Sequence, residues 1–319
     1  MFTLNRFAPW SDDFAFTYSD NIKEFDTLII HNPPEAMCFS PVLMHSRKSL
    51  QEHIEFIAEQ HIKKAIVVAE DITFLRFCPD LENVRIIPPL SAEKIDYSPI
   101  YDMPNLSHLT IQKPEESNFK ITFDSERMNG LNYLLVDGWN SDLNLASAKN
   151  LKTLILENDH PRETDLEFFG QSCPLENLVI GSSRIVSLSG IEHAYQLKRL
   201  ELFYNKRLQN IESLSAVKNS LTWLEIDSCG AINDYSVISE LKNLEYLKIK
   251  GSKSIPSLDF IKNLKELKIL VVKINVLDGE LSHCLNIPYV EIDNKRHYSH
   301  KNSDFSKELS FIPRMKDFY

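Results

Sequence analysis

Hydrophobic residues along this chain follow one short phrase: an aliphatic residue, two variable residues, a second aliphatic, one variable residue and a third aliphatic. Six clear copies begin at Leu151, Leu175, Leu197, Leu221, Leu244 and Leu267, and weaker copies begin at Leu81, Leu106, Leu131 and Ile287. Their starts lie 20 to 25 residues apart, a period that indicates stacked structural repeats. The pattern predicts ten coils, each contributing one short strand.

The apolar residues between these strands fall three or four positions apart. One such run is Leu208, Ile211, Leu214, Val217 and Leu221, and a second is Ile232, Tyr235, Ile238, Leu241 and Leu244. This spacing is the period of a helix. Each predicted strand is therefore expected to be followed by one or two helical turns.

The ninth position of the phrase carries small polar residues. The clear copies have Asp159, Ser183, Asn205, Cys229, Ser252 and Asn275 there, whereas three weak copies have Pro89, Pro114 and Trp139. A small polar side chain satisfies backbone groups of the turn that leaves the strand, which stacking of the coils would otherwise bury without partners. We expect a regular ladder of such side chains in the clear copies and an irregular one in the weak copies.

The phrase and its ninth position together resemble the LxxLxLxxN/C signature of leucine-rich repeats, and NDYSVISELKNLEYLKI, from Asn233, is similar to bacterial internalin-type repeats. The resemblance covers roughly residues 81–293. It implies an α/β leucine-rich-repeat solenoid in which a parallel sheet lines a concave face and short helices or turns form the convex face. Such arrays need atypical caps at both ends.

Residues 1–80 are interpreted as an irregular N-terminal cap, with a small independent α/β domain as the alternative. FDTLII from Phe25 and IKKAIVV from Ile62 look like degenerate strands, and residues 47–60 have the spacing of an amphipathic helix. Residues 294–319 are expected to form a C-terminal cap and tail, with Phe305, Leu309, Phe311 and Ile312 covering the last coil.

The variable positions of each phrase are expected to face solvent on the concave sheet, because side chains alternate along a strand. Aromatic residues recur at the third position, as Tyr133, Trp223, Tyr246 and Tyr289. Aromatic residues among a few charges are typical of protein-binding hot spots, although they can also simply stabilise a sheet through cross-strand pairs. The candidate partner-binding residues are Arg199, Glu201, Phe203, Tyr204, Trp223, Glu225, Asp227, Tyr246 and Lys248.

Motifs for catalysis, cofactors or metals are not evident in the sequence. There is no GxSxG, Walker loop or GxGxxG, and the nearest histidine pair, His297 and His300, lacks a third ligand. Cys229 occupies the ninth position of its repeat, so a structural role explains it. We therefore expect no catalytic residue, no cofactor and no metal site.

Charge and cysteine content narrow the function further. The net charge is −10, and residues 1–140 alone carry 12 basic and 21 acidic groups. An acidic chain disfavours nucleic-acid binding and accelerates association with a basic protein. Five scattered cysteines fit a reducing cytoplasm better than a disulfide framework. No basic leader followed by an apolar run opens the chain, and no segment is apolar enough to predict a membrane span.

These observations favour a cytoplasmic, bacterial, non-catalytic module whose concave face binds one protein partner. An immunity or antitoxin-type inhibitor that masks a basic toxin is the more specific hypothesis. Two alternatives stay open: an exported effector or scaffold that binds host or envelope components, and a small enzymatic or ligand-binding domain in residues 1–80 with the repeats as its targeting arm. The oligomeric state does not follow from the sequence.

Overall fold

The computed structural model of the chain divides into two compact units, which meet in the sequence between residues 143 and 144. Each unit is a row of parallel strands with short connecting segments. The structure describes residues 16–17, 27–32, 49–89, 92, 95–112, 127, 130–138, 145, 148–158, 165–169 and 173–308.

The first unit contains six parallel strands in sequence order. They are β1 (Phe16–Thr17), β2 (Thr27–Asn32), β3 (Lys64–Ala69), β4 (Asn83–Ile87), β5 (His108–Ile111) and β6 (Tyr133–Asp137). The strands predicted near Phe25 and Ile62 are confirmed as β2 and β3. The helix predicted for residues 47–60 is confirmed as α1 (Leu50–Gln60), which begins after Ser49 with a capping box formed with Glu52.

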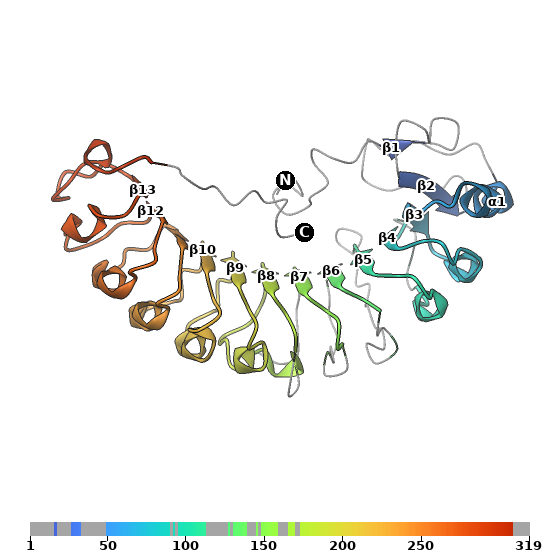
Figure 1. Cartoon of the computed structure of the whole chain (residues 1–319), viewed down its shortest axis with the longest axis horizontal. Helices are drawn as coiled ribbons and strands as arrows, with labels where there is room; N and C mark the ends of the chain where they lie inside the picture. The colour runs from blue at the N-terminus through green and yellow to red at the C-terminus, as the bar shows by residue number, and fades with distance from the viewer. Residues whose placement is uncertain are drawn as a thin grey trace. The chain divides into compact units, whose positions relative to one another are not determined.

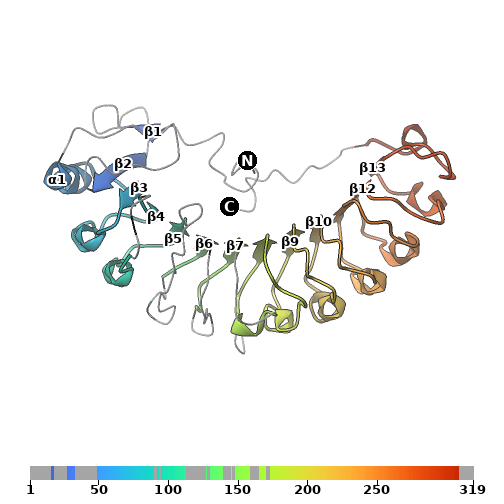
Figure 2. The ribbon, with the colours of Figure 1, turned by 180° about the vertical axis from the view of Figure 1, so that it is seen from behind.

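The second unit contains seven parallel strands, again in sequence order (Figure 1). They are β7 (Thr153–Glu157), β8 (Asn177–Gly181), β9 (Arg199–Phe203), β10 (Trp223–Asp227), β11 (Tyr246–Lys250), β12 (Ile269–Lys273) and β13 (Tyr289–Ile292). Within this unit the strands lie along the inner side of the coils and the connecting segments along the outer side, as the reverse view also shows (Figure 2). This is the predicted α/β leucine-rich-repeat architecture.

Every strand from β4 to β13 begins at the third position of its phrase, so within each unit equal positions of neighbouring coils lie in register. The first, fourth and sixth positions point into the coil and are buried throughout; in the coil of β10 these are Leu221, Leu224 and Ile226. Burying aliphatic side chains contributes about 1.5 to 3 kcal/mol each. The stack of these three aliphatic rows is the core of both units.

Apart from α1, the helices that the structure describes between or after the strands are 3-10 helices, which is a tighter form than the helical turns expected from the sequence. Their i to i+3 hydrogen bonds include Ile238 N–H to Tyr235 O at 3.1 Å and Leu241 N–H to Ile238 O at 3.0 Å. A coil of about 23 residues leaves room for only a turn or two, where 3-10 geometry is common. The segments are η3 (Thr73–Phe77), η4 (Ser98–Asp102), η6 (Glu167–Phe169), η7 (Ile191–His193), η8 (Glu212–Val217), η9 (Ser236–Glu240), η10 (Asp259–Asn263), η11 (Ser282–Cys284) and η12 (Asn302–Asp304).

The chain after β13 folds back on the edge of that strand. Lys307 forms an antiparallel bridge with Tyr289, and Val290 N–H donates to Ser306 O at 3.2 Å. Phe305 is buried. Covering an edge strand in this way blocks its pairing with another chain. Leu309, Phe311 and Ile312 lie outside the described residues, and the predicted boundaries at residues 80 and 293 stay predictions.

Among the described helices, none combines the length and the apolar character needed to cross a bilayer.

Candidate functional site

Eight of the candidate residues lie on β9, β10 and β11, where together with Lys250 they form three short rows on the inner surface of the sheet. The third-position row is Arg199, Trp223 and Tyr246; the fifth-position row is Glu201, Glu225 and Lys248; and the seventh-position row is Phe203, Asp227 and Lys250. Because the strands are parallel and in register, each row runs straight across the sheet. We call these nine residues the β9–β11 face.

The third-position row is a stack of planar groups. The rings of Trp223 and Tyr246 are nearly parallel, at an interplanar angle of 5° and with centroids 3.6 Å apart. The Arg199 guanidinium carbon lies 4.5 Å from the centroid of the Trp223 ring on the opposite side. Trp223 is therefore enclosed between a cation and a second ring, an arrangement that combines cation–π attraction with aromatic stacking.

The expectation that these side chains face solvent is wrong for Arg199 and Trp223. Only 2% of Arg199 and 7% of Trp223 are exposed, and Tyr246 is half-buried. Glu201 and Asp227 are buried as well. The physical reason is the width of the groups: large planar side chains in register across neighbouring strands cover one another. They form a second packed layer on the sheet, and its partly exposed members are Phe203, Glu225, Tyr246, Lys248 and Lys250.

Ion pairs hold the fifth-position row in place. Arg199 pairs with Glu201 on the same strand, and Lys248 Nζ lies 2.8 Å from Glu225 Oε2 on the neighbouring strand. Burial raises the pKa of Glu201, and the nearby Glu225 carboxylate adds to this, while Arg199 opposes it. Two carboxylates side by side in one row are tolerated because each has its own cation.

The seventh-position row ends the strands. Lys250 Nζ lies 2.9 Å from Asp227 Oδ2, which makes a third ion pair. Phe203 pairs in register with Gly181 of β8, and a Cβ at Gly181 would lie 2.0 Å from Phe203 Cε2. The Phe203 ring therefore occupies the space that a side chain at 181 would take. The sequence interpretation missed Lys250 and Gly181. For Gly181 a signal was present, because a glycine occupies the seventh position of one repeat and Phe203 occupies the seventh position of the next.

Tyr204 is not on the strand with the other candidates. It is the eighth residue of its repeat, in the turn that leaves β9, and its φ is 55°. Asn158, Ser182 and Ser228 occupy the equivalent position in other coils and are also left-handed, with φ between 51° and 60°. Tyr204 therefore belongs to the edge of the sheet, where it borders a hollow described below.

Cys229 lies at the ninth position, where its role is structural. It is buried, its Sγ is 3.6 Å from Asp227 O, and it accepts a hydrogen bond from the Asn205 amide. Burial raises the pKa of this thiol to about 12. A buried thiol with a raised pKa is little ionised at neutral pH, which makes it a weak nucleophile.

His297 and His300 lie in the segment after β13. His297 Nε2 is 2.9 Å from Val276 O, and His300 Nδ1 is 2.9 Å from Ser299 Oγ. In the described part of the chain, no three His, Cys, Asp or Glu side chains are grouped closely enough to hold a metal ion. Both histidines are engaged with neighbouring groups of the chain end.

The β9–β11 face is chemically suited to non-covalent contact. Its three carboxylates are each paired with a cation, so these groups are committed to one another rather than poised to transfer protons. Its aromatic side chains are fixed before any ligand arrives. What the face offers is a rigid surface that combines apolar rings with charges at defined positions.

Comparison with solved structures places this architecture among known folds. The internalin InlF of Listeria monocytogenes aligns over 93% of this chain and 89% of its own, with a TM-score of 0.59 and 15% identity. The InlJ functional domain of the same organism aligns over 66% of this chain and 43% of its own, with a TM-score of 0.45 and 14% identity. Internalin C2, also of Listeria monocytogenes, aligns over 57% and 77%, with a TM-score of 0.43 and 18% identity.

No protein-family profile matches the chain, and no curated protein sequence is similar enough to count as a relative. The alignment with InlF covers most of both chains at 15% sequence identity, so it supports a shared fold and carries no information about function. The chain has the leucine-rich-repeat fold, similar to that of an internalin.

Proposed function

We propose that this chain is a non-catalytic binding module that holds one protein partner through the β9–β11 face. The observation that carries the proposal is the Tyr246 ring, which keeps part of its surface exposed and is held in place by stacking on the buried Trp223, itself covered by Arg199. Trp, Tyr and Arg are the residues over-represented in binding hot spots. Here all three lie in one row, of which Tyr246 is the partly exposed member, next to the fifth-position row of paired charges.

Pre-organisation is the reason such a face binds well. Immobilising a flexible side chain on binding costs about 0.5 to 1.5 kcal/mol. Trp223 and Tyr246 are already stacked, and Lys248 is already paired with Glu225, so this cost is largely absent when a partner docks. Phe203, Tyr246 and Lys248 keep part of their surface accessible for the contact.

We further propose that the partner is basic and that binding masks it, as an immunity or antitoxin-type inhibitor does. The support is the charge of the chain, −10 overall, with an excess of nine acidic groups in residues 1–140. The β9–β11 face contributes three cations and three carboxylates, so its own charge is balanced. The acidic remainder would therefore attract the partner and the balanced face would fix its orientation.

The proposed place of action is the reducing cytoplasm of a bacterium. The support is that Cys78, Cys173, Cys229 and Cys284 are all free and buried. Free thiols in this number suit a compartment that keeps them reduced. An exported scaffold would bind a host or envelope component instead, and the capture experiment separates these outcomes.

The test is affinity capture from the native cell extract with the tagged full chain, followed by mass spectrometry. The captured protein is then produced and its affinity is measured for Tyr246→Ala, with Tyr195→Ala as the matched control. Tyr195 is an exposed tyrosine away from the sheet. We expect Tyr246→Ala to weaken binding at least about tenfold, as loss of a hot-spot ring does, and Tyr195→Ala to leave the affinity unchanged.

A second variant protects this test from a folding artefact, because Tyr246 also supports Trp223. Lys248→Gln removes the charge of a partly exposed side chain, while its amide can still donate to Glu225 and no third carboxylate joins the row. It should weaken binding while the thermal midpoint falls less than in Tyr246→Ala. Equal affinity for all variants would refute the β9–β11 face as the site. A partner that is acidic, or not neutralised by co-expression, would refute the inhibitor proposal and leave the binding face standing.

A further inference from the structure

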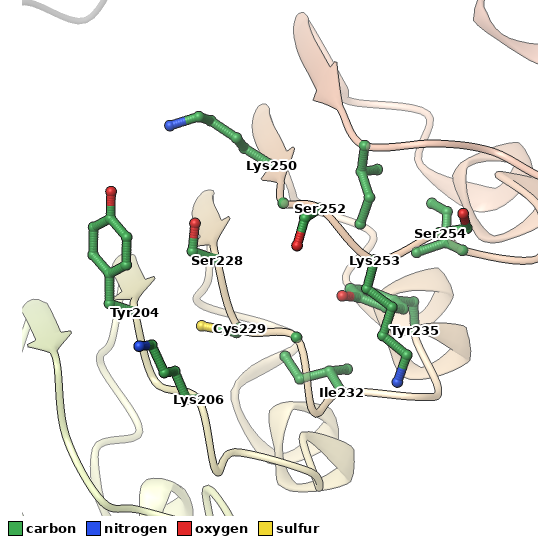
Figure 3. A pocket seen from close by; sticks show the side chains of 14 residues that line it. Tyr204, Lys206, Ser228, Cys229, Ile232, Tyr235, Lys250, Ser252, Lys253 and Ser254 are labelled. Carbon is green, nitrogen blue, oxygen red and sulfur yellow. The ribbon is translucent and has the colours of Figure 1, made fainter.

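A hollow of about 380 Å³ lies beyond the ends of β9, β10 and β11, at the edge of the sheet rather than on its inner surface (Figure 3). The coil after β9 borders it with Lys206, and the coil after β11 borders it with Lys253. The floor between them is formed by residues of the β10 coil, including Cys229 and Ile232. We call this hollow the edge pocket.

The edge pocket lies where the ninth-position ladder continues with smaller side chains, although Cys229 still accepts a hydrogen bond from Asn205. In the coil of β9, Asn205 fills this space: its Oδ1 accepts from Ser183 N–H at 2.9 Å and its Nδ2 donates to Ile180 O at 2.8 Å. The next two coils carry Cys229 and Ser252 in its place, and both side chains are shorter than asparagine. Ser183 N–H has Asn205 Oδ1 as its acceptor in the next coil. Within the described residues, the backbone N–H of Cys229 has no equivalent acceptor.

The lining of the edge pocket is positively charged. It contains Lys206, Lys250 and Lys253, and the described lining holds no carboxylate. Lys250 is neutralised by Asp227 of the neighbouring strand. Lys253 Nζ donates to Asn233 Oδ1, an uncharged group, at 2.6 Å, and within the described residues Lys206 forms no ion pair. Two cationic groups are thus left uncompensated on opposite sides of the hollow (Figure 3).

Neutral donors and apolar walls complete the edge pocket. Ser252, which precedes Lys253 on the same coil, contributes a hydroxyl to the lining (Figure 3). The Cys229 backbone N–H follows the left-handed turn at Ser228, whose φ is 60° and whose own N–H donates to Lys250 O at 2.8 Å. Tyr235, Ile255 and Ile274 supply an apolar wall. The volume is at the lower end of the range for small-molecule sites.

We propose that the edge pocket binds a phosphoryl group carried on a small organic molecule. Two uncompensated ammonium groups match the charge of a phosphate monoester, which is between about −1.5 and −2 at neutral pH. The hydroxyl and amide donors suit its several oxygens, whereas a carboxylate would satisfy only part of this set. The apolar wall accommodates the organic part. The edge pocket shares Lys250 with the β9–β11 face, but the phosphoryl proposal does not depend on the protein-binding proposal.

The test is a calorimetric titration of the full chain with phenyl phosphate, inorganic phosphate and benzoate at constant ionic strength. Phenyl phosphate should bind saturably and more tightly than inorganic phosphate, because only the ester contacts the apolar wall. Benzoate, which shares the ring and lacks the second charge, should bind at least about tenfold more weakly. Equal binding of benzoate would overturn the phosphoryl assignment.

Two variants locate the binding. The double substitution Lys206→Ala with Lys253→Ala should weaken phenyl phosphate binding about tenfold or more, because each removes a charge-assisted contact. The control is Lys242→Ala with Lys265→Ala, which removes the same charge from exposed positions outside the pocket, and it should leave the affinity unchanged. An equal loss of phenyl phosphate affinity in both double variants would show that the ligand is attracted by general positive charge, and would overturn the assignment of the edge pocket as its site.

Ser252→Asn is the sharper variant, because it keeps every charge. Asparagine at this position restores the ladder geometry seen at Asn205, so the variant should fold at least as stably as the parent chain. Its side chain would occupy the hollow and abolish phenyl phosphate binding. Unchanged binding by Ser252→Asn would overturn the placement, and no saturable binding by the parent chain up to about 10 mM, the limit of a weak specific site, would overturn the proposal as a whole.

Discussion

Phe203 owes its position to the missing side chain at Gly181. The Phe203 ring lies where a Cβ of residue 181 would be. We expect Gly181→Ala to push the ring off the sheet and to lower the free energy of unfolding by about 1 to 3 kcal/mol, the usual cost of overpacking. Denaturant unfolding measures this change.

Gly230→Ala is the matched control for this prediction. A Cβ at Gly230 would meet no atom within 4 Å, and its φ is not left-handed. The control should therefore change the free energy of unfolding by no more than about 0.5 kcal/mol. If the two variants have the same stability, Phe203 is not held by Gly181 in the way the structure indicates.

The buried thiols give a prediction in pH. Burial raises the pKa of Cys78, Cys229 and Cys284 to about 12 and that of Cys173 to about 11, from an ordinary value of 9.0. Because the folded values are raised, the thiols favour folding below about pH 9, and this contribution is lost as the pH rises toward 12. At pH 8 the four thiols should resist alkylation in the folded chain and react after denaturation.

Peptide mapping by mass spectrometry checks this residue by residue. Fast labelling of Cys229 in the folded chain would contradict its structural role, because only an accessible thiolate reacts at that rate. The other three described cysteines serve as internal references, since each is equally buried in a different coil.

The burial of some side chains could be predicted from the sequence, and the burial of others could not. The buried rows at Leu221, Leu224 and Ile226 followed from the repeat, because aliphatic side chains at those spacings have only one side of the strand on which to be buried. The burial of Trp223 did not follow. It depends on Arg199 and Tyr246 lying directly beside it, and register across three strands separated by more than 20 residues each is a property of the folded sheet.

At the scale of the repeat, the ninth-position ladder joins one coil to the next. Asn205 is fully buried and its amide bonds to two backbone groups of the preceding coil. We expect Asn205→Ala to lower the free energy of unfolding by about 2 to 5 kcal/mol, because it leaves a buried N–H and a buried C=O without partners.

Asn243→Ala provides the comparison for the ladder. Asn243 also donates to a backbone carbonyl of the preceding coil, at Asn219 O and 2.9 Å, but it is exposed. Water can replace that bond, so the variant should lose less than about 1 kcal/mol. Thermal or denaturant unfolding measures the loss of stability in both variants. If the two variants lose a similar free energy of unfolding, burial of the Asn205 side chain is not what makes the ladder stabilising.

The elements of the repeats could be predicted because their pattern is periodic. All ten predicted strands are present, from β4 at Leu81's phrase to β13 at Ile287's phrase. The 3-10 form of the outer segments was not predicted, because apolar residues three or four apart fit both helix types. β1 was missed because two paired residues, Phe16 and Thr17, leave no period to detect. The edge pocket was missed although Lys206 and Lys253, each following a ladder position, were a visible signal.

At the scale of the whole molecule, charge is distributed unevenly along the chain. Residues 1–140 carry an excess of nine acidic groups, whereas residues 241–319 carry 14 basic and 10 acidic groups. If the partner is basic, raising the salt concentration from about 50 to about 500 mM should slow association about tenfold or more and leave dissociation nearly unchanged. Stopped-flow kinetics with the captured partner measures both rates. An association rate that does not depend on salt would contradict a basic partner.

The most direct test of the binding face is hydroxyl-radical footprinting of the full chain with and without the captured partner. It reports the accessibility of individual aromatic side chains in one experiment. Bound partner should protect Phe203 and Tyr246 on the sheet and leave Phe77 and Tyr195, which are exposed on outer segments, as reactive as before. Protection of Phe77 or Tyr195 with unchanged oxidation of Phe203 and Tyr246 would place the partner elsewhere and contradict the account.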